Sequence, residues 1–291
     1  VNYSINYTNP YFTINGISRG INFFYQKSNY ANQYVEDYQL DNIGVGVNYG
    51  YPISDTQRLI FGIKIKRISV KLGNDPSNEA KSYVSKFGYR YQNILGSIAW
   101  NDSDLIGGLL PTEGYLKTIS LSMSTPLGSQ EYYNIKLKSE KYWNIQSNLW
   151  LFHLKGCLGY ANNYGTTDQL PFFNNYFAGG AYSVRGYSAL SLGPKNSYSM
   201  GSTKIRSALG GNMLLTATTE LIFPMPGVEN YQSVRTAFFL DAGNVFTNHC
   251  LPFNDQCTIG FNAAHIRYSV GLSWTWVTPI APLSFNLAKA L

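Results

Sequence analysis

Residues 58–70 read RLIFGIKIKRISV, and apolar side chains occupy every second position through much of this stretch. Leu59, Phe61, Ile63 and Ile65 fall on one side, while Lys64 and Lys66 fall on the other. Because successive side chains of a β-strand point to opposite faces, this pattern predicts a strand with one apolar and one polar face. The stretch exceeds the ~5–6 residues usual in soluble sheets and suffices for the ~9–11 residues of a strand that crosses a bilayer.

The same alternation recurs along most of the chain. In residues 131–143 and again in residues 268–278, apolar and polar side chains take alternate positions. Helical spacing is found over no useful length, so we predict no helix. The pattern predicts about twelve strands, at roughly 1–9, 17–27, 40–52, 57–70, 91–102, 114–126, 131–144, 147–162, 208–224, 233–247, 265–279 and 282–290.

The connections between these strands are mostly short on one side and long on the other. Short ones such as YPISDTQ (51–57) and TPIAP (278–282) are rich in turn-forming residues. The long polar ones are 28–39, 71–90, 163–207 and 248–264, although 127–130 is short. This arrangement is typical of bacterial outer-membrane barrels, whose long loops lie outside the cell. We therefore predict an all-β transmembrane antiparallel barrel that forms a single domain over residues 1–291.

The composition favours lipid over water as the surroundings of this barrel. Only 13% of residues are charged, whereas 15% are aromatic and 24 are tyrosine. A soluble β-sandwich or lipocalin-like barrel would need more charge on its outer face. In the membrane barrel the apolar face meets lipid and the lumen is lined by Lys64, Lys66, Lys136 and Lys138. Candidates for the interfacial aromatic girdle, or else ordinary packing residues, are Trp143, Trp274 and Trp276.

Several classes of function are disfavoured by the residues. The net charge of +6 is spread thinly, without the basic cluster typical of nucleic-acid binding. No apolar run reaches the ~18 residues of a membrane-spanning helix. The histidines are scattered, and no G-x-S-x-G motif occurs. We therefore expect no enzyme, no catalytic residue and no cofactor.

Strand direction bears on the two ends of the chain. If 9–16 is a periplasmic turn, the first strand starts at the outer surface, whereas a complete barrel normally starts in the periplasm. The last strand, 282–290, runs outward and leaves an edge that cannot face lipid unpaired. The sequence does not open with a signal peptide. We therefore expect that strands are missing before Val1 and after Leu291.

One arginine stands alone in the longest loop, within FFNNYFAGGAYSVRGYSALSLGPK (172–195). Strand parity places Glu220 and Asp241 on the inner face of neighbouring predicted strands. Carboxylates at membrane depth are costly on the lipid side, and two of them together favour a nearby cation. Arg185 can supply planar, bidentate hydrogen bonds to them. The alternative is that Arg185 is solvated and that the carboxylates pair elsewhere, for example with Arg235.

The three cysteines fall into two groups. Cys250 and Cys257 are close together in a polar loop, which favours a disulfide in an oxidising compartment. A metal site with His249 and His265 is the alternative, although the spacing matches no zinc pattern. Cys157 lies in a predicted strand and is most simply a small apolar side chain.

Several motifs, taken in order, resemble one family. The residues that carry the resemblance are TNPYFT (8–13), LPTEGYLKTISLSMSTPLGSQEYYNIKL (110–137), NNYFAGGAYSVRGY (174–187), LGPK (192–195), TTELIFPMP (218–226), SVRTAFFLDAGNVF (233–246) and IRYSVGLSWTWVTPIAPLSFNLAKAL (266–291). They resemble the barrel domain of the BamA family of outer-membrane protein insertases. That family belongs to a superfamily with the TamA-type and two-partner secretion transporters and the organellar import barrels.

The resemblance carries expectations about fold and site. It implies a sixteen-stranded family barrel of which this chain holds strands four to fifteen. The first three strands, the last strand, the gate between first and last strands and the N-terminal periplasmic repeat domains are then absent. It implies that the long loop, about 163–207, folds into the lumen and that its arginine meets acidic residues on the inner wall. The residues of this structural lock are Val184, Arg185, Gly186, Tyr187, Glu220 and Asp241.

The resemblance also carries expectations about function. It implies an insertase in the bacterial outer membrane that takes unfolded β-barrel proteins and assists their folding into the bilayer without nucleotide hydrolysis. Accessory lipoproteins are expected partners through the periplasmic domains. The alternatives are a polypeptide-secreting pore of the two-partner or TamA type and a passive porin.

Overall fold

A computed structural model describes residues 1–30, 37–74, 76–146, 150–197, 207–225, 233–251, 254 and 257–291. Within these residues twelve antiparallel strands form one sheet, and each strand pairs with its neighbours in chain order. The strands are β1 (Asn2–Asn9), β2 (Ser18–Asn29), β3 (Tyr38–Pro52), β4 (Gln57–Leu72), β5 (Arg90–Ser103), β6 (Gly114–Ser124), β7 (Tyr132–Gln146), β8 (Trp150–Asn163), β9 (Met213–Phe223), β10 (Val234–Phe246), β11 (Arg267–Val277) and β12 (Pro282–Ala290). The helices are α1 (Asn78–Phe87) and two 3₁₀ turns, η1 (Phe172–Asn174) and η2 (Ala263–His265).

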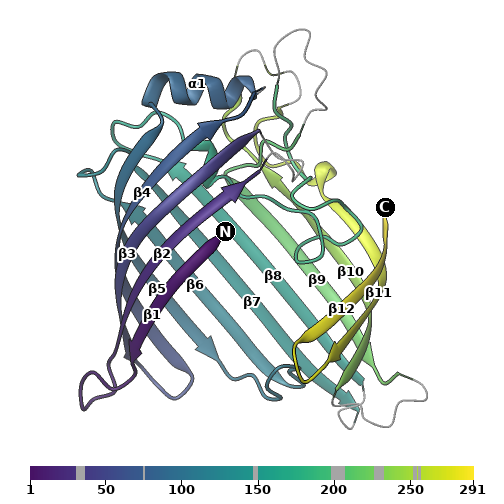
Figure 1. The fold of residues 1–291 in the computed structure, drawn as a ribbon. Coiled ribbons are helices and arrows are strands. Elements are labelled where there is room, and N and C mark those ends of the chain that lie inside the picture. The colour runs from purple at the N-terminus through teal and green to yellow at the C-terminus, as the bar shows by residue number, and fades with distance from the viewer. Residues whose placement is uncertain are drawn as a thin grey trace.

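The sheet curls around an interior space that we call the lumen (Figure 1). Tight connections such as 10–17 and 278–281 lie at one end of the sheet, the turn end. Helix α1 and the longer connections lie at the other, the loop end. In this structure β1 and β12 each pair on one side only. The prediction of about twelve antiparallel strands is confirmed, with bounds that differ mostly by one to three residues.

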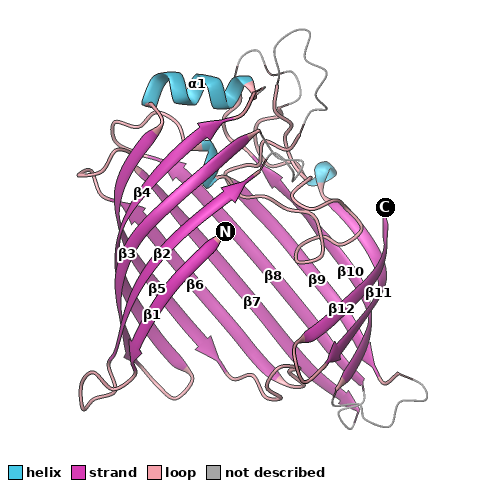
Figure 2. Ribbon diagram, viewed as in Figure 1, coloured by secondary structure: helices cyan, strands magenta, loops and turns pink. Residues whose placement is uncertain are grey.

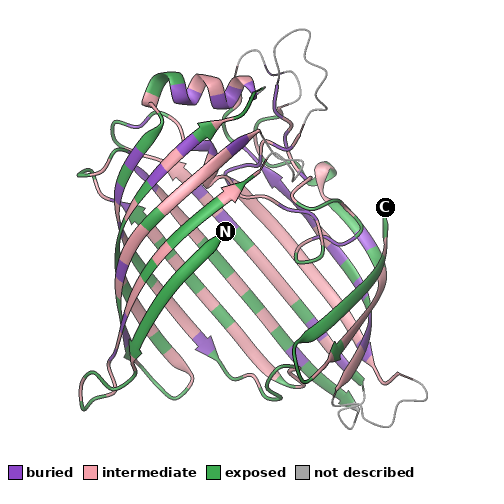
Figure 3. Cartoon of the chain, in the orientation of Figure 1, coloured by how far each residue is buried: buried purple, intermediate pink, exposed green. Residues whose placement is uncertain are grey.

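The two faces of the sheet differ as strand parity predicts. On β4 the outward side chains of Phe61, Ile63 and Ile65 are 45%, 64% and 53% exposed. Inward Lys64 and Lys66 line the wall of the lumen together with asparagines and serines of β1, β2 and β5 to β7. Figure 3 shows exposed and half-buried residues alternating along the strands. A sheet that exposes so many large apolar side chains on its outer face is built to contact lipid.

Helix α1 contradicts our expectation that the chain forms no helix (Figure 2). The Ser77 hydroxyl accepts a hydrogen bond from the Ala80 amide and caps its first turn, while Gly88, at φ +83°, ends it. The buried face, with Tyr83 and Val84, packs on an aromatic cluster at the loop end. Ten residues inside a polar connection give too short a helical pattern to detect. Neither α1 nor any other helix in the described residues has the length and apolar character needed to cross a membrane.

The strand predicted at 208–224 begins later, at Met213. Residues 208–212 instead hold the long loop in place. Gly210 has φ +73°, and Gly211 exchanges backbone hydrogen bonds with Tyr176 of that loop. Period-two patterning cannot detect this change, because the alternation does not report whether the stretch pairs with a strand or with a loop.

Candidate functional site

Arg185 lies inside the lumen, where the connection between β8 and β9 turns inward. Its guanidinium donates two hydrogen bonds to Asp241 of β10, from Nε to Oδ2 at 2.7 Å and from Nη2 to Oδ1 at 2.7 Å. A third, from Nη1, reaches Glu220 Oε1 of β9 at 2.8 Å. The Arg185 amide also donates to Asp241 Oδ2, at 3.0 Å. The arginine is therefore held in one plane by two strands at once.

The three side chains of this ion pair are largely shielded from solvent. The side chain of Asp241 is fully buried, and those of Arg185 and Glu220 are only 10% and 17% exposed. The guanidinium carbon lies 3.5 Å from the centre of the Phe239 ring, so the planar cation also stacks on an aromatic face. Burial makes removal of one partner costly, since the other charge would then stay uncompensated. A lysine at position 185 would keep the charge but lose both the bidentate geometry and the stacking.

The loop backbone is shaped to present the arginine. Val184 is fully buried against Ala178, Leu192 and Val245, and its carbonyl accepts a hydrogen bond from the Gly180 amide at 3.1 Å. Gly186 follows with φ +85°. A Cβ at Gly186 would lie 3.2 Å from the Ala290 amide nitrogen of β12, so glycine is favoured by both conformation and space.

Tyr187 ties the same loop to the last two strands. Its hydroxyl lies 3.1 Å from the carbonyl oxygens of both Tyr268 and Leu291, so it can donate to either one. These carbonyls come from β11 and from the residue that follows β12. The four residues 184–187 therefore contact β9, β10, β11 and β12 within one short segment.

Sequence reasoning missed a second partner of Glu220. His153 of β8 stands opposite Glu220 in the register, and its Nδ1 lies 2.9 Å from Glu220 Oε2. The His153 ring stacks on Tyr142 with centres 4.0 Å apart. His153 could have been placed on the inner face by parity, but its position opposite Glu220 depends on a register set across a connection of about fifty residues.

Arg235, the alternative partner considered for the carboxylates, forms no ion pair with them in the described part of the chain. Its Nη2 donates to the Pro111 carbonyl at 2.6 Å, and its guanidinium carbon lies 5.8 Å from the Tyr142 ring centre. Within the described residues, the side chain of Glu220 contacts those of Arg185 and His153.

The cysteines of the loop after β10 are covalently joined. Cys250 and Cys257 form a disulfide with their Cα atoms 5.7 Å apart. His249 lies beside this disulfide, and His265 belongs to η2. Cys157 is a free thiol on β8. Within the described residues, no three side chains of the His, Cys, Asp or Glu type gather closely enough to hold a metal ion.

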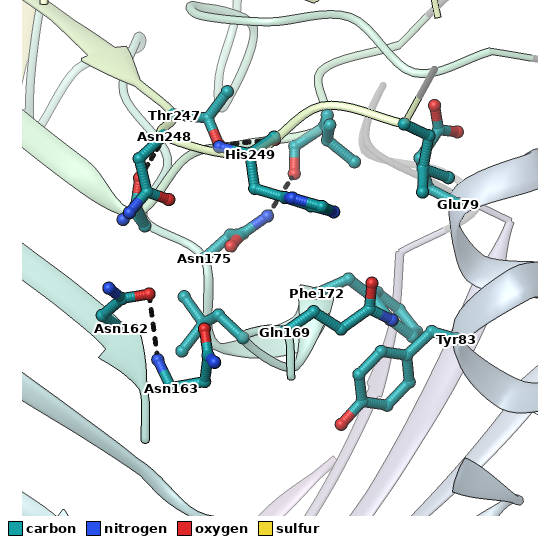
Figure 4. A pocket seen from close by; sticks show the side chains of 14 residues that line it. Glu79, Tyr83, Asn162, Asn163, Gln169, Phe172, Asn175, Thr247, Asn248 and His249 are labelled. Atoms are coloured by element: carbon teal, nitrogen blue, oxygen red, sulfur yellow. Dashed lines mark hydrogen bonds between the residues drawn. The ribbon is translucent and has the colours of Figure 1, made fainter. Parts of the chain in front are cut away.

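A small cavity lies beside α1 at the loop end (Figure 4). It has a volume of about 70 Å³, and its walls come from α1, β8 and the two loops that follow β8 and β10. Amide side chains such as Asn162, Asn163 and Asn175 dominate the labelled wall. A space of this size holds a few water molecules and is much smaller than the ~300–1,000 Å³ of a typical ligand pocket.

Comparisons with known proteins agree along the whole chain. Residues 1–291 match the Omp85 superfamily domain. The outer membrane protein assembly factor BamA of Neisseria meningitidis serogroup B is 28% identical over 316 residues, covering 100% of this chain and 39% of that protein. The crystal structure of BamA from Haemophilus ducreyi lacking POTRA domains 1-3 superposes with a TM-score of 0.87 at 29% identity, covering 100% of this chain and 58% of that one.

A second solved structure resembles the chain in fold alone. CdiB from Escherichia coli superposes with a TM-score of 0.57 at 13% identity, covering 100% of this chain and 49% of that one. The chain thus spans less than two thirds of the length of each of these relatives.

Proposed function

The chain belongs to the Omp85 superfamily of outer-membrane β-barrel proteins, and from this premise we propose that it is the barrel part of an outer-membrane protein insertase. The insertase takes unfolded β-barrel proteins that reach the membrane from the periplasm and assists their folding into the bilayer. Nucleotide hydrolysis is not needed, because burial and hydrogen bonding of the substrate's own strands supply the driving force.

One observation carries this proposal. The barrel superposes on the Haemophilus ducreyi BamA barrel at a TM-score of 0.87, against 0.57 for the CdiB of Escherichia coli. The likeness to BamA extends over the whole chain in sequence as well, at 28% identity for the Neisseria meningitidis protein. The chain therefore superposes more closely on an assembly factor than on CdiB.

In this proposal Arg185 is a structural clasp with no part in chemistry. It fixes the inward-folded loop to β9 and β10 through Glu220 and Asp241, while Tyr187 reaches β11 and β12. A clasp that joins four neighbouring strands makes this side of the barrel rigid. Substrate strands would then pair with an exposed edge of the barrel by β-augmentation, because main-chain hydrogen bonds require no particular side chains.

The proposal implies three partners. The apolar outer face contacts the lipid bilayer, and unfolded outer-membrane β-barrel proteins are the substrates. Accessory lipoproteins are expected to bind periplasmic domains, like the POTRA domains named for the Haemophilus ducreyi BamA, that the full-length protein would carry.

Controlled depletion of the full-length protein in its own host tests this function. Quantitative proteomics of the outer membrane should show that many unrelated β-barrel proteins fall together, and plasmid-borne wild-type protein should restore them. A depletion of a β-barrel protein outside this family serves as the control for general envelope damage.

Two other outcomes would overturn the insertase proposal. Loss of a single secreted polypeptide, with other barrels unchanged, would identify a secretion pore. A large and steady conductance of the purified full-length protein in planar bilayers, together with an unchanged outer-membrane proteome, would identify a porin.

A further inference from the structure

The outward face of the barrel carries a group of cations at the loop end of β2 to β5. Outward Lys27, Asp41, Ser69 and Arg90 stand in one row across these four strands, each the register partner of the next. Two further cations of β4 flank Ser69 on the same face, each two residues away. We call the four cations the loop-end cation patch: Lys27, Arg67, Lys71 and Arg90.

The patch is compact and exposed. Neighbouring strands are ~4.8 Å apart and alternate residues ~6.8 Å apart along a strand, so its members lie within about 15 Å of one another. Lys27, Arg67 and Arg90 are exposed, and the Lys71 side chain is 64% exposed. Two carboxylates lie among them: Asp41 pairs with Lys71 at 3.4 Å, and Asp37, just before β3, lies beside Gly73, two residues from Lys71. Four cations against these two carboxylates leave a net charge of +2.

The position of the patch relates it to the membrane surface. On β2 to β4 the outward residues next in line toward the turn end, Tyr25, Ile43 and Ile65, are apolar or aromatic, and on β5 the polar Gln92 is followed by Ile94. The cations therefore begin where the lipid-facing band ends, at the depth of lipid headgroups. The long loops of outer-membrane barrels lie outside the cell, so this is the outer leaflet.

The charge is concentrated on one side of the barrel. At the loop end of β6 to β11 the outward strand positions of the described residues carry no charge; they are Met123, Tyr133, Asn162, Met213, Phe246 and Tyr268. On β12 a single outward cation, Lys289, stands opposite Val270. A general need for solubility at the rim would distribute charge around it. A local cluster of one sign indicates a local anionic ligand instead.

We propose that the loop-end cation patch is a docking site for the phosphate groups of an anionic lipid in the outer leaflet. Arginine offers a planar pair of donors that matches a phosphate, and lysine contributes a point charge. Clusters of basic residues at a membrane surface bind anionic headgroups through this combination, and each cation increases the binding affinity ~5-fold. The docked lipid would lie directly below α1, beside β2 to β5.

Binding of lipid A to the purified full-length protein, folded in uncharged detergent micelles, tests the proposal. The probe is fluorescently labelled lipid A with both phosphates present, and the same lipid without phosphates is the ligand control. The test variant combines Lys27→Gln, Arg67→Gln and Arg90→Gln. The matched control combines Lys64→Gln, Lys66→Gln and Lys136→Gln, which remove the same charge from the lumen side of β4 and β7.

We expect the patch variant to bind phosphorylated lipid A about a hundredfold more weakly and the lumen variant to bind it like the wild type. The variant Asp41→Asn should bind it more tightly, because it removes one opposing charge and releases Lys71. This gain cannot arise from misfolding. Heat-modifiable migration in gels reports the folded fraction of every variant.

Three results would overturn the proposal. One is equal loss of binding in the patch and lumen variants, which would mean that only net charge matters. Another is unchanged binding in the patch variant or weaker binding in Asp41→Asn. The third is full displacement of the lipid by excess inorganic phosphate, which would indicate a site for small anions rather than for a lipid.

Discussion

At the scale of single residues, the molecule concentrates its buried charge around Arg185. Three hydrogen bonds from one guanidinium, at 2.7–2.8 Å, join two carboxylates on neighbouring strands, and a phenylalanine ring covers the cation from one face. Burying either carboxylate alone would cost desolvation free energy, and the arginine offsets this cost for both. Arginine differs from lysine here in geometry rather than in charge, because its forked guanidinium donates hydrogen bonds to both Asp241 carboxylate oxygens at once.

We expect Arg185→Ala to lower the free energy of unfolding by about 3 kcal/mol and Arg185→Lys by about 1–2 kcal/mol. The alanine leaves the buried Asp241 charge without a compensating cation, whereas the lysine keeps the charge without the bidentate contact. Urea denaturation in detergent micelles, followed by tryptophan fluorescence, measures both. Arg58→Ala, at an exposed arginine of β4, is the control and should change stability by less than about 0.5 kcal/mol.

A double-mutant cycle with Asp241→Asn separates the contact from general damage. The two substitutions should be strongly non-additive, because either one alone already breaks the pair. Additive effects would show that Arg185 and Asp241 do not stabilise each other.

At the scale of elements, α1 fastens the loops at the loop end to one another. Glu79, in its first turn, is buried and accepts hydrogen bonds from the Ser197 amide at 3.0 Å, the Ser197 hydroxyl at 2.9 Å and Asn254 Nδ2 at 2.7 Å. Tyr83 accepts a hydrogen bond from Gln130 Nε2 at 2.6 Å. Burial raises the pKa of the Tyr83 hydroxyl above its usual range, so Tyr83 stays neutral at physiological pH.

We expect Glu79→Ala to speed amide hydrogen exchange in α1 by about 5- to 100-fold, since it removes the acceptor that joins the helix to Ser197 and Asn254 of two loops. Hydrogen exchange followed by mass spectrometry measures this. Lys86→Ala on the same helix removes the ion pair between Lys86 and Asp168. Both of these side chains are more than half exposed. Exposed pairs contribute little, so the control should exchange like the wild type. Equal exchange in all three proteins would refute the role of Glu79.

At the scale of the whole molecule, the two faces of one sheet meet different solvents. The outward face of β3 to β6 is apolar, with Val47, Phe61, Ile98 and Leu121 side by side. The inward face carries lysines, asparagines and serines around the lumen. A period of two in each strand is sufficient to produce this division, because every strand contributes alternate residues to each face.

We expect Ile63→Lys to destabilise the barrel by about 2–4 kcal/mol in lipid vesicles, because Ile63 lies within the apolar outer band. Ser122→Lys places the same charge on the lumen side of β6 and should be nearly neutral. Unfolding by urea in vesicles of a neutral, short-chain phosphatidylcholine compares the two. Equal effects would mean that the outward face does not contact lipid.

Much of the fold could be predicted from the sequence because its signal is local. Alternation in stretches such as 58–70 identifies the strands and their two faces without knowledge of any partner. Parity likewise places Glu220 and Asp241 on the inner face. Helix α1 could not be predicted, because its stability comes from packing on the loop-end aromatic cluster and from contacts with distant loops.

The sequence by itself determined the strands, their sidedness and the unusual isolation of Arg185. The tertiary structure decided that His153 stands opposite Glu220, that Arg185 gives two of its bonds to Asp241, and that the cations of β2 to β5 share one patch. Each of these depends on the register between strands and on the path of long loops. Register is fixed by contacts between residues far apart in the chain, and the alternation within a single strand carries no information about it.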